Sequence, residues 1–170
     1  LFVRIDRRRK FHATVLLRAL GMTAEDLLNY FYRRDTLVFD GRKVSKVFRP
    51  EHLEGAKASR DVRHPETNDL ILKEGRKFTK LALRNMEHAG ITLVPIASEE
   101  ALGRVSAYDV KDAKSGEVLL GCNEDITEEK LELLRTRGID RVDILFLDDS
   151  HIGSALRTTL SQDKIADPQE

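Results

Sequence analysis

The sequence is poor in the residues and segments that mark secreted and membrane proteins. It has a single cysteine, Cys122, so no disulfide can form within one chain, and a reducing compartment is expected. No apolar run approaches the roughly 20 residues that a membrane helix requires, and no segment has the pattern of a signal peptide. These absences predict a cytoplasmic protein with no membrane partner.

The chain also lacks net charge, because 29 Lys and Arg balance 29 Asp and Glu. Isolated nucleic-acid-binding domains are usually strongly basic, so we expect this chain alone to bind DNA weakly. The charge is nevertheless unevenly distributed. Residues 1–18 hold six cations and one anion, whereas residues 124–132 hold five anions and one cation. The first segment is suited to a polyanion, and the second to solvent or a basic partner.

The most informative stretch runs from residue 5 to residue 21. Four consecutive cations at residues 7–10 follow a short extended segment at residues 1–3 and lead directly into an apolar helix, expected at residues 12–20. This stretch resembles the bacterial RNA polymerase β subunit, in which the same segment enters the domain called the β lobe. One position departs from that family, which usually has a proline where His12 stands.

The ends of the chain predict a fragment of a longer protein. The sequence begins at Leu1 without a methionine, and residues 167–170 resemble the start of another helix. The resemblance to the β subunit covers both flanks, residues 1–32 and 154–170. It extends less specifically to the residues between them.

The resemblance implies a DNA-directed RNA polymerase, a nucleotidyltransferase that copies DNA into RNA from nucleoside triphosphates. The implied partners are the β′, α, omega and sigma subunits, in the bacterial cytoplasm at the nucleoid. Magnesium would be held by the β′ subunit, with no cofactor in this fragment. The fragment alone is expected to be inactive.

In that family the lobe lines one wall of the downstream DNA channel and faces the non-template strand. The resemblance therefore implies that the basic run contacts DNA. Asp6, Arg7 and Arg8 are the first candidates, and Arg9 and Lys10 are the second. Arginine suits both phosphates and guanine edges. The alternative interpretation is a solvated charged face that precedes a helix and binds nothing.

A duplication is visible in the middle of the chain. Residues 55–96 and 103–144 align without a gap at an offset of 48, with ten identical pairs among 42 positions, where ordinary composition gives about three. Each copy predicts a β-hairpin, a helix and a strand. An N-cap threonine and a terminal glycine mark the helix limits in both copies: Thr79 and Gly90, then Thr127 and Gly138.

The predicted fold class is α+β, with helical host segments flanking an inserted tandem-repeat unit. Neither half is expected to bury enough surface alone, so we expect the two halves to pack face to face. A hairpin with the turn signal Asp40–Gly41 is expected in the same sheet. The predicted domains are the N-terminal part of the lobe at residues 1–34, the insertion at residues 35–150, and a return segment at residues 151–170.

The insertion offers a candidate docking surface. The β subunits resembled here carry large lobe insertions in some bacteria, and such insertions are thought to contact accessory transcription factors. The acidic helix face formed by Glu128, Glu129 and Glu132 is our candidate for protein docking. The equally weighted alternative is a passive insertion that folds and binds nothing.

No catalytic constellation is recognised in the sequence. None of the five histidines stands three or four residues from a second type of metal ligand. Cys122 lacks a basic neighbour, which favours an apolar role, and a turn explains the Asp-Asp-Ser-His run at residues 148–151. The second predicted helix is too acidic to read a DNA groove. The runner-up function is therefore a stand-alone protein-interaction adaptor without enzymatic context.

Overall fold

A computed structural model of the chain describes residues 1–4, 7, 9–147 and 155–162. Six α-helices and several small antiparallel sheets occur in these residues. The mixed helix-and-strand class is therefore as predicted. None of the helices in the described part is long and apolar enough to cross a membrane.

The N-terminal residues form a short antiparallel hairpin. Strand β1 (Phe2–Arg4) pairs with β2 (Lys10–His12), and the ring centroids of Phe2 and His12 lie 4.7 Å apart. The second strand was not predicted, and the expectation that the basic run leads directly into a helix is wrong. Pairing with β1 keeps residues 10–12 extended, so helix α1 (Ala13–Ala19) begins one residue later than expected.

Three helices pack together beside this hairpin. They are α1, α2 (Ala24–Phe31) and α6 (Ala155–Gln162). The predicted capping box of α2 is confirmed, because Thr23 Oγ1 accepts a hydrogen bond from the Asp26 amide and the Asp26 carboxylate accepts one from the Thr23 amide. Leucines of α2 and α6 share one core: Leu27, Leu28, Leu156 and Leu160.

A four-stranded antiparallel sheet has the order β10-β3-β4-β7. The predicted hairpin lies at its centre. The bounds of the four strands are β3 (Arg33–Asp40), β4 (Lys43–Val47), β7 (Leu93–Ile96) and β10 (Arg141–Phe146). Gly41 makes the turn between β3 and β4 with a φ of 57°, a conformation that glycine adopts without strain. One row of residues paired across the four strands consists of Val142, Leu37, Lys46 and Val94.

The connections that lead into β7 and β10 contain the same elements in the same order. The first holds α3 (Pro50–Leu53), β5 (Val62–Arg63), β6 (Leu70–Leu72) and α4 (Lys80–His88). The second holds a 3-10 helix, η1 (Ser98–Ala101), β8 (Val110–Lys111), β9 (Val118–Leu120) and α5 (Glu128–Thr136). Each element of the first connection begins 48 residues before its counterpart in the second.

Contacts within the two connections recur at the same offset. Val62 lies opposite Leu72 as Val110 lies opposite Leu120, and both hairpins have a register shift at this point. The side chains that cap the two long helices also correspond: Thr79 accepts from the Ala82 amide at 3.2 Å, and Thr127 from the Lys130 amide at 3.3 Å.

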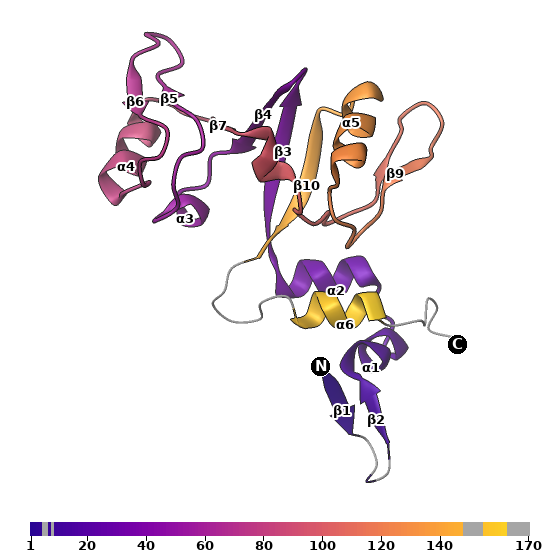
Figure 1. The fold of residues 1–170 in the computed structure, drawn as a ribbon. Coiled ribbons are helices and arrows are strands. Elements are labelled where there is room, and N and C mark those ends of the chain that lie inside the picture. The colour runs from indigo at the N-terminus through magenta and orange to yellow at the C-terminus, as the bar shows by residue number, and fades with distance from the viewer. Residues whose placement is uncertain (5–6, 8, 148–154, 163–170) are drawn as a thin grey trace.

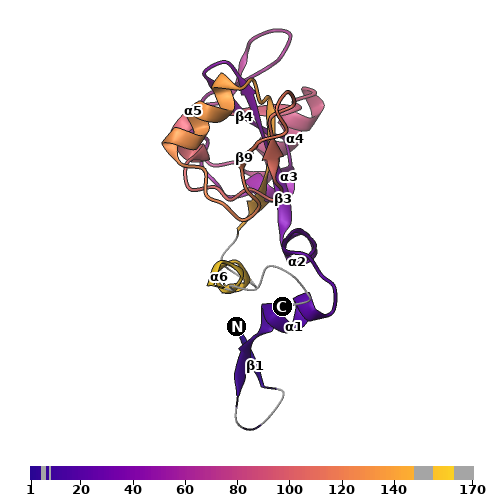
Figure 2. The same ribbon diagram turned by 90° about the vertical axis from the view of Figure 1, so that its right-hand side faces the viewer.

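The expected face-to-face packing of the two halves is not seen. We call residues 55–96 the first half and residues 103–144 the second half. The central hairpin separates their last strands in the sheet, so each half buries its own apolar cluster against a different part of the sheet. Figure 1 shows α4 and α5 on either side of the sheet strands, and Figure 2 shows this unit above α1, α2 and α6.

Candidate nucleic-acid interface

The N-terminal hairpin concentrates positive charge at the end where the chain passes from β1 to β2. Arg4 of β1 lies directly opposite Lys10 of β2, and Arg7 and Arg9 are exposed between the strands. Like charges directly opposite one another destabilise a strand pair, so a bound polyanion would relieve this repulsion. Among the predicted residues, the structure brings Lys10 beside Arg4 and leaves Arg7 and Arg9 at the surface.

Two of the predicted contact residues, Asp6 and Arg8, lie outside the described residues. Arg4 is a candidate that our site prediction omitted. Its charge was visible in the sequence, but its position opposite Lys10 depends on the unpredicted strand β2. We use the name basic hairpin for β1, β2 and the residues that join them.

The predicted docking residues lie on the solvent side of α5. Glu128, Glu129 and Glu132 are all exposed, whereas Leu131 and Leu134 of the same helix are buried. The first two glutamates stand in the first turn, where the positive end of the helix dipole stabilises them. Glu132 accepts a hydrogen bond from Arg135 at 2.6 Å, which offsets part of its charge.

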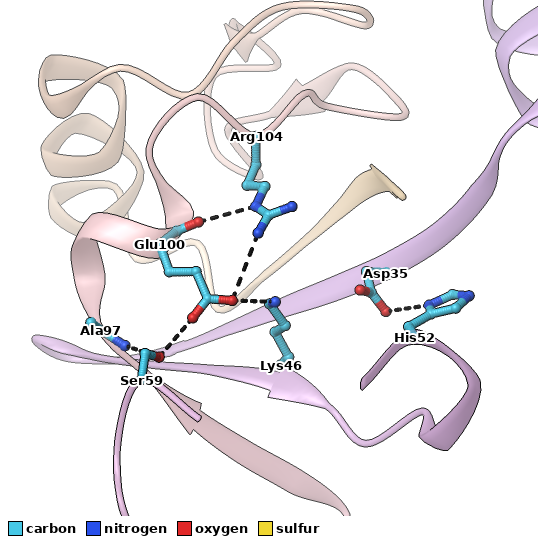
Figure 3. A network of polar contacts seen from close by, with 7 residues as sticks. All are labelled: Asp35, Lys46, His52, Ser59, Ala97, Glu100 and Arg104. Atoms are coloured by element: carbon cyan, nitrogen blue, oxygen red, sulfur yellow. Dashed lines mark hydrogen bonds and ion pairs between the residues drawn. The ribbon is translucent and has the colours of Figure 1, made fainter. Parts of the chain in front are cut away.

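Two pairs of polar side chains join strands β3 and β4 to neighbouring segments, one pair buried and the other partly buried (Figure 3). His52 Nδ1 lies 2.9 Å from Asp35 Oδ1, and these side chains are 4% and 7% exposed. On the neighbouring strand, Lys46 contacts the Glu100 carboxylate. Buried charges are costly unless paired, so these contacts stabilise the fold and the sequence spacing did not reveal them.

The Glu100 carboxylate is the centre of the second network. Its Oε2 accepts from Ser59 Oγ at 2.6 Å, and Arg104 lies 3.7 Å from its Oε1. Burial alone would raise the pKa of Glu100. The hydrogen bonds from Lys46 and Ser59, together with the charges of Lys46 and Arg104, hold that pKa below its ordinary value of 4.5.

The comparisons with known proteins agree over the full length of the chain. It is 47% identical over 170 residues to the DNA-directed RNA polymerase subunit beta of Syntrophotalea carbinolica. It is 45% identical over 185 aligned residues to that of an Anaeromyxobacter species, and 40% identical over 185 to that of Myxococcus xanthus. Each alignment covers all of this chain, which spans 12–13% of the relatives' length. The chain belongs to the family of the RNA polymerase β subunit.

No family model matches this β-subunit segment. The residues that the structure describes contain no group of three or more His, Cys, Asp or Glu side chains that could hold a metal ion.

A polar cavity of about 460 Å³ lies between α2 and the sheet of this β-subunit segment. Three arginines line it, Arg33, Arg34 and Arg49, but Glu51 and Asp143 lie on the same walls. Arg34 also donates a hydrogen bond to the Tyr108 hydroxyl. Because cations and carboxylates are nearly balanced, the cavity has no clear preference for an anion.

Cys122 is packed and has little nucleophilic character. Its Sγ donates to the Ala107 carbonyl at 3.4 Å, and it packs beside the core shared by α2 and α6. Burial, with smaller effects from the nearby carboxylates of Glu25 and Asp109, raises the pKa of this thiol to about 11. At neutral pH the thiol is therefore protonated, in accord with the apolar role that the sequence favoured.

Proposed function

We propose that this chain is the part of an RNA polymerase β subunit that lines the DNA channel, and that its basic hairpin contacts DNA. The observation that carries the proposal is the pairing of Arg4 with Lys10, with Arg7 and Arg9 exposed beside them. A cluster of exposed cations is the electrostatic footprint of phosphate binding. Family membership supplies DNA as the polyanion.

The whole protein's activity follows from the same proposal. The enzyme is a nucleotidyltransferase that transcribes DNA into RNA, in the cytoplasm at the nucleoid, together with the β′, α, omega and sigma subunits. Magnesium is held by β′, and this segment shapes the channel without contributing a catalytic residue. Contact would be with the downstream duplex or the non-template strand.

We further propose that residues 35–150 are an insertion into the lobe that arose by tandem duplication. Support comes from the recurrence of elements and hydrogen bonds at an offset of 48. The sheet registers fit a pseudo-twofold axis between Leu37 and Lys46, since Val142 and Val94 flank this pair symmetrically. Residues 1–34 and 151–170 are then the lobe on either side.

The exposed glutamates of α5 fit a docking surface for an accessory transcription factor with a basic face. A passive insertion remains the competing proposal for this helix. The stand-alone adaptor is a competing proposal for the whole chain. An immunoblot of source cells distinguishes the polymerase subunit from the adaptor. A band far larger than 19.4 kDa that purifies with the other polymerase subunits excludes the adaptor.

The DNA contact is tested on reconstituted holoenzyme that carries Arg7→Gln, Arg9→Gln and Lys10→Gln. A matched control carries Arg42→Gln, Lys43→Gln and Lys114→Gln, three exposed cations within residues 35–150, which we call the central unit. Open-complex lifetime is measured over a series of salt concentrations. Each lost phosphate contact should reduce the salt slope by about 0.9 for duplex DNA. A hairpin variant indistinguishable from the control would show that the basic hairpin does not bind DNA.

A further inference from the structure

The two halves of the central unit have the same order of strands and helices but formal charges of opposite sign. The first half has eight Lys and Arg against five Asp and Glu, a formal charge of +3. The second half has seven against ten, a formal charge of −3. Copies of one scaffold therefore present different electrostatic surfaces.

The difference is concentrated on α4, α5 and the turns before them. Four cations of the first half stand where the second half has carboxylates. These pairs, each 48 residues apart, are Arg76 and Glu124, Lys77 and Asp125, Lys80 and Glu128, and Arg84 and Glu132. All four cations are exposed. Two pairs are reversed in the other direction, because Glu66 corresponds to Lys114 and Glu87 to Arg135.

The carboxylates of the second half are largely neutralised within the chain. Glu124 pairs with Lys130 at 3.2 Å, and Glu132 with Arg135 at 2.6 Å. Asp125 pairs with Arg157 of α6 at 2.6 Å, which ties the second half to the helices below it. This face therefore serves, at least in part, as an internal attachment.

The cations of the first half have few such partners. Among the four cations named above, only Lys80 has an ion pair in the part of the chain that the structure describes, with Glu54 at 3.6 Å; elsewhere in the first half, Arg63 pairs with Asp61 at 3.4 Å. Lys57 lies directly opposite Lys77 in an antiparallel bridge, where the second half has Val105 opposite Asp125. Two lysines opposite one another repel, so a bound polyanion would stabilise this face, as it would the basic hairpin.

We propose that the basic face of the first half, formed by Lys57, Arg76, Lys77, Lys80 and Arg84, is a second contact for the backbone of duplex DNA. The proposal rests on the proposed function, because it takes DNA as the polyanion that the assembled enzyme holds. Figure 1 shows α4 and β6 at the end of the molecule away from the basic hairpin, so the two contacts are separate.

The arrangement of the cations favours a phosphate backbone over a single anionic group. They come from α4, from the turn before it and from the bridge residue Lys57, and so form a band. Lys80 and Arg84 are four residues apart, which places them about 6 Å apart along the helix axis. The exposed side chain of Leu81, 69% exposed on the same helix, would instead suit an acidic protein, so the test includes that outcome.

The test uses holoenzyme with a full-length β subunit that carries Lys57→Gln, Lys77→Gln, Lys80→Gln and Arg84→Gln. Its control carries Arg42→Gln, Lys43→Gln, Lys111→Gln and Lys114→Gln, an equal change of charge at exposed positions elsewhere. Binding to a linear duplex without a promoter is measured against salt concentration. We expect the slope of log K against log salt to fall by about 2 to 4 in the variant, and to stay unchanged in the control.

A second measurement identifies the partner directly. A photo-cross-linking residue replaces Asn85, an exposed neighbour of Arg84 on α4, in otherwise unchanged holoenzyme bound to the same duplex. Cross-links to DNA are expected. An unchanged salt slope, or cross-links to protein alone, would overturn the proposal. Two parallel measurements test the proposed function separately. They are the salt slope of the basic hairpin variant and RNA synthesis by the unchanged enzyme.

Discussion

His52 Nδ1 lies 2.9 Å from Asp35 Oδ1, although 17 residues separate the two in the sequence. The imidazole also stacks on the Phe146 ring, with centroids 4.0 Å apart and an interplanar angle of 8°. This one side chain therefore joins α3 to two neighbouring strands, β3 and β10. At the offset of 48, His52 corresponds to Glu100, the centre of the other buried network.

Substitution of Asp35 by Ala should destabilise the chain, because it leaves the buried imidazole of His52 without its partner. We expect a loss of about 1–3 kcal/mol in the free energy of unfolding, measured by urea denaturation. Asp40→Ala, at the exposed end of the same strand, is the control and should change the free energy by less than about 0.5 kcal/mol. Equal effects of the two substitutions would mean that the buried pair adds no stability.

The Lys46–Glu100 pair should respond asymmetrically to loss of either partner. Glu100→Gln leaves the buried ammonium without a countercharge and should cost about 3–5 kcal/mol. Lys46→Met should cost less, about 1–3 kcal/mol, because Ser59 and Arg104 still contact Glu100. In a double-mutant cycle, the double variant should be more stable than Glu100→Gln alone. Strict additivity would show that the two side chains do not interact.

Acid should weaken the network of contacts around Glu100. Because the pKa of Glu100 is lowered in the folded chain, the unfolded chain takes up the proton at a higher pH than the folded chain does. The stabilisation is thus present above the ordinary pKa of 4.5 and is lost as the pH falls through the lower, folded value. Glu100→Gln should therefore flatten the dependence of unfolding free energy on pH below 4.5. Parallel pH profiles of variant and parent would contradict this assignment.

Local signals explain what could be predicted from the sequence. Identical residues at an offset of 48 predicted matching elements in the two halves, and Thr79 and Thr127 located the starts of α4 and α5. The alignment nevertheless missed that α3 and η1 occupy matching positions, because Pro50–Leu53 and Ser98–Ala101 share only one identical pair, Glu51 and Glu99. Each segment is a single short helical turn, α-helical at Pro50–Leu53 and 3-10 at Ser98–Ala101.

The charged contacts could not be predicted because they depend on tertiary packing. Asp35 and His52 meet only after the sheet forms, and Lys46 and Glu100 are 54 residues apart. The second strand of the basic hairpin was missed for a similar reason. Residues 10–12 have no strong strand pattern of their own and are extended because β1 lies beside them.

The two copies should tolerate exchange of their left-handed residues. Asn68 has a φ of 61° and its counterpart Gly116 one of 71°, so both occupy a region that glycine and asparagine enter most easily. Gly116→Asn should therefore change the free energy of unfolding by less than about 0.5 kcal/mol. Gly116→Val should cost at least about 1–2 kcal/mol, although a Cβ there meets no atom within 4 Å. Equal costs for Asn and Val would mean that the backbone conformation is not the cause.

Cys122 should react slowly with iodoacetamide while the chain is folded. Its pKa of about 11 compares with an ordinary value of 9.0, so at pH 8 the reactive thiolate should be roughly tenfold to a hundredfold scarcer than in the urea-unfolded chain. Glu25→Gln removes one of the charges that raise this pKa and should speed alkylation of the folded protein. A control, Glu66→Gln, alters an exposed carboxylate in the first half and should leave the rate unchanged. Equal rates for folded and unfolded chains would show that the thiol is not shielded.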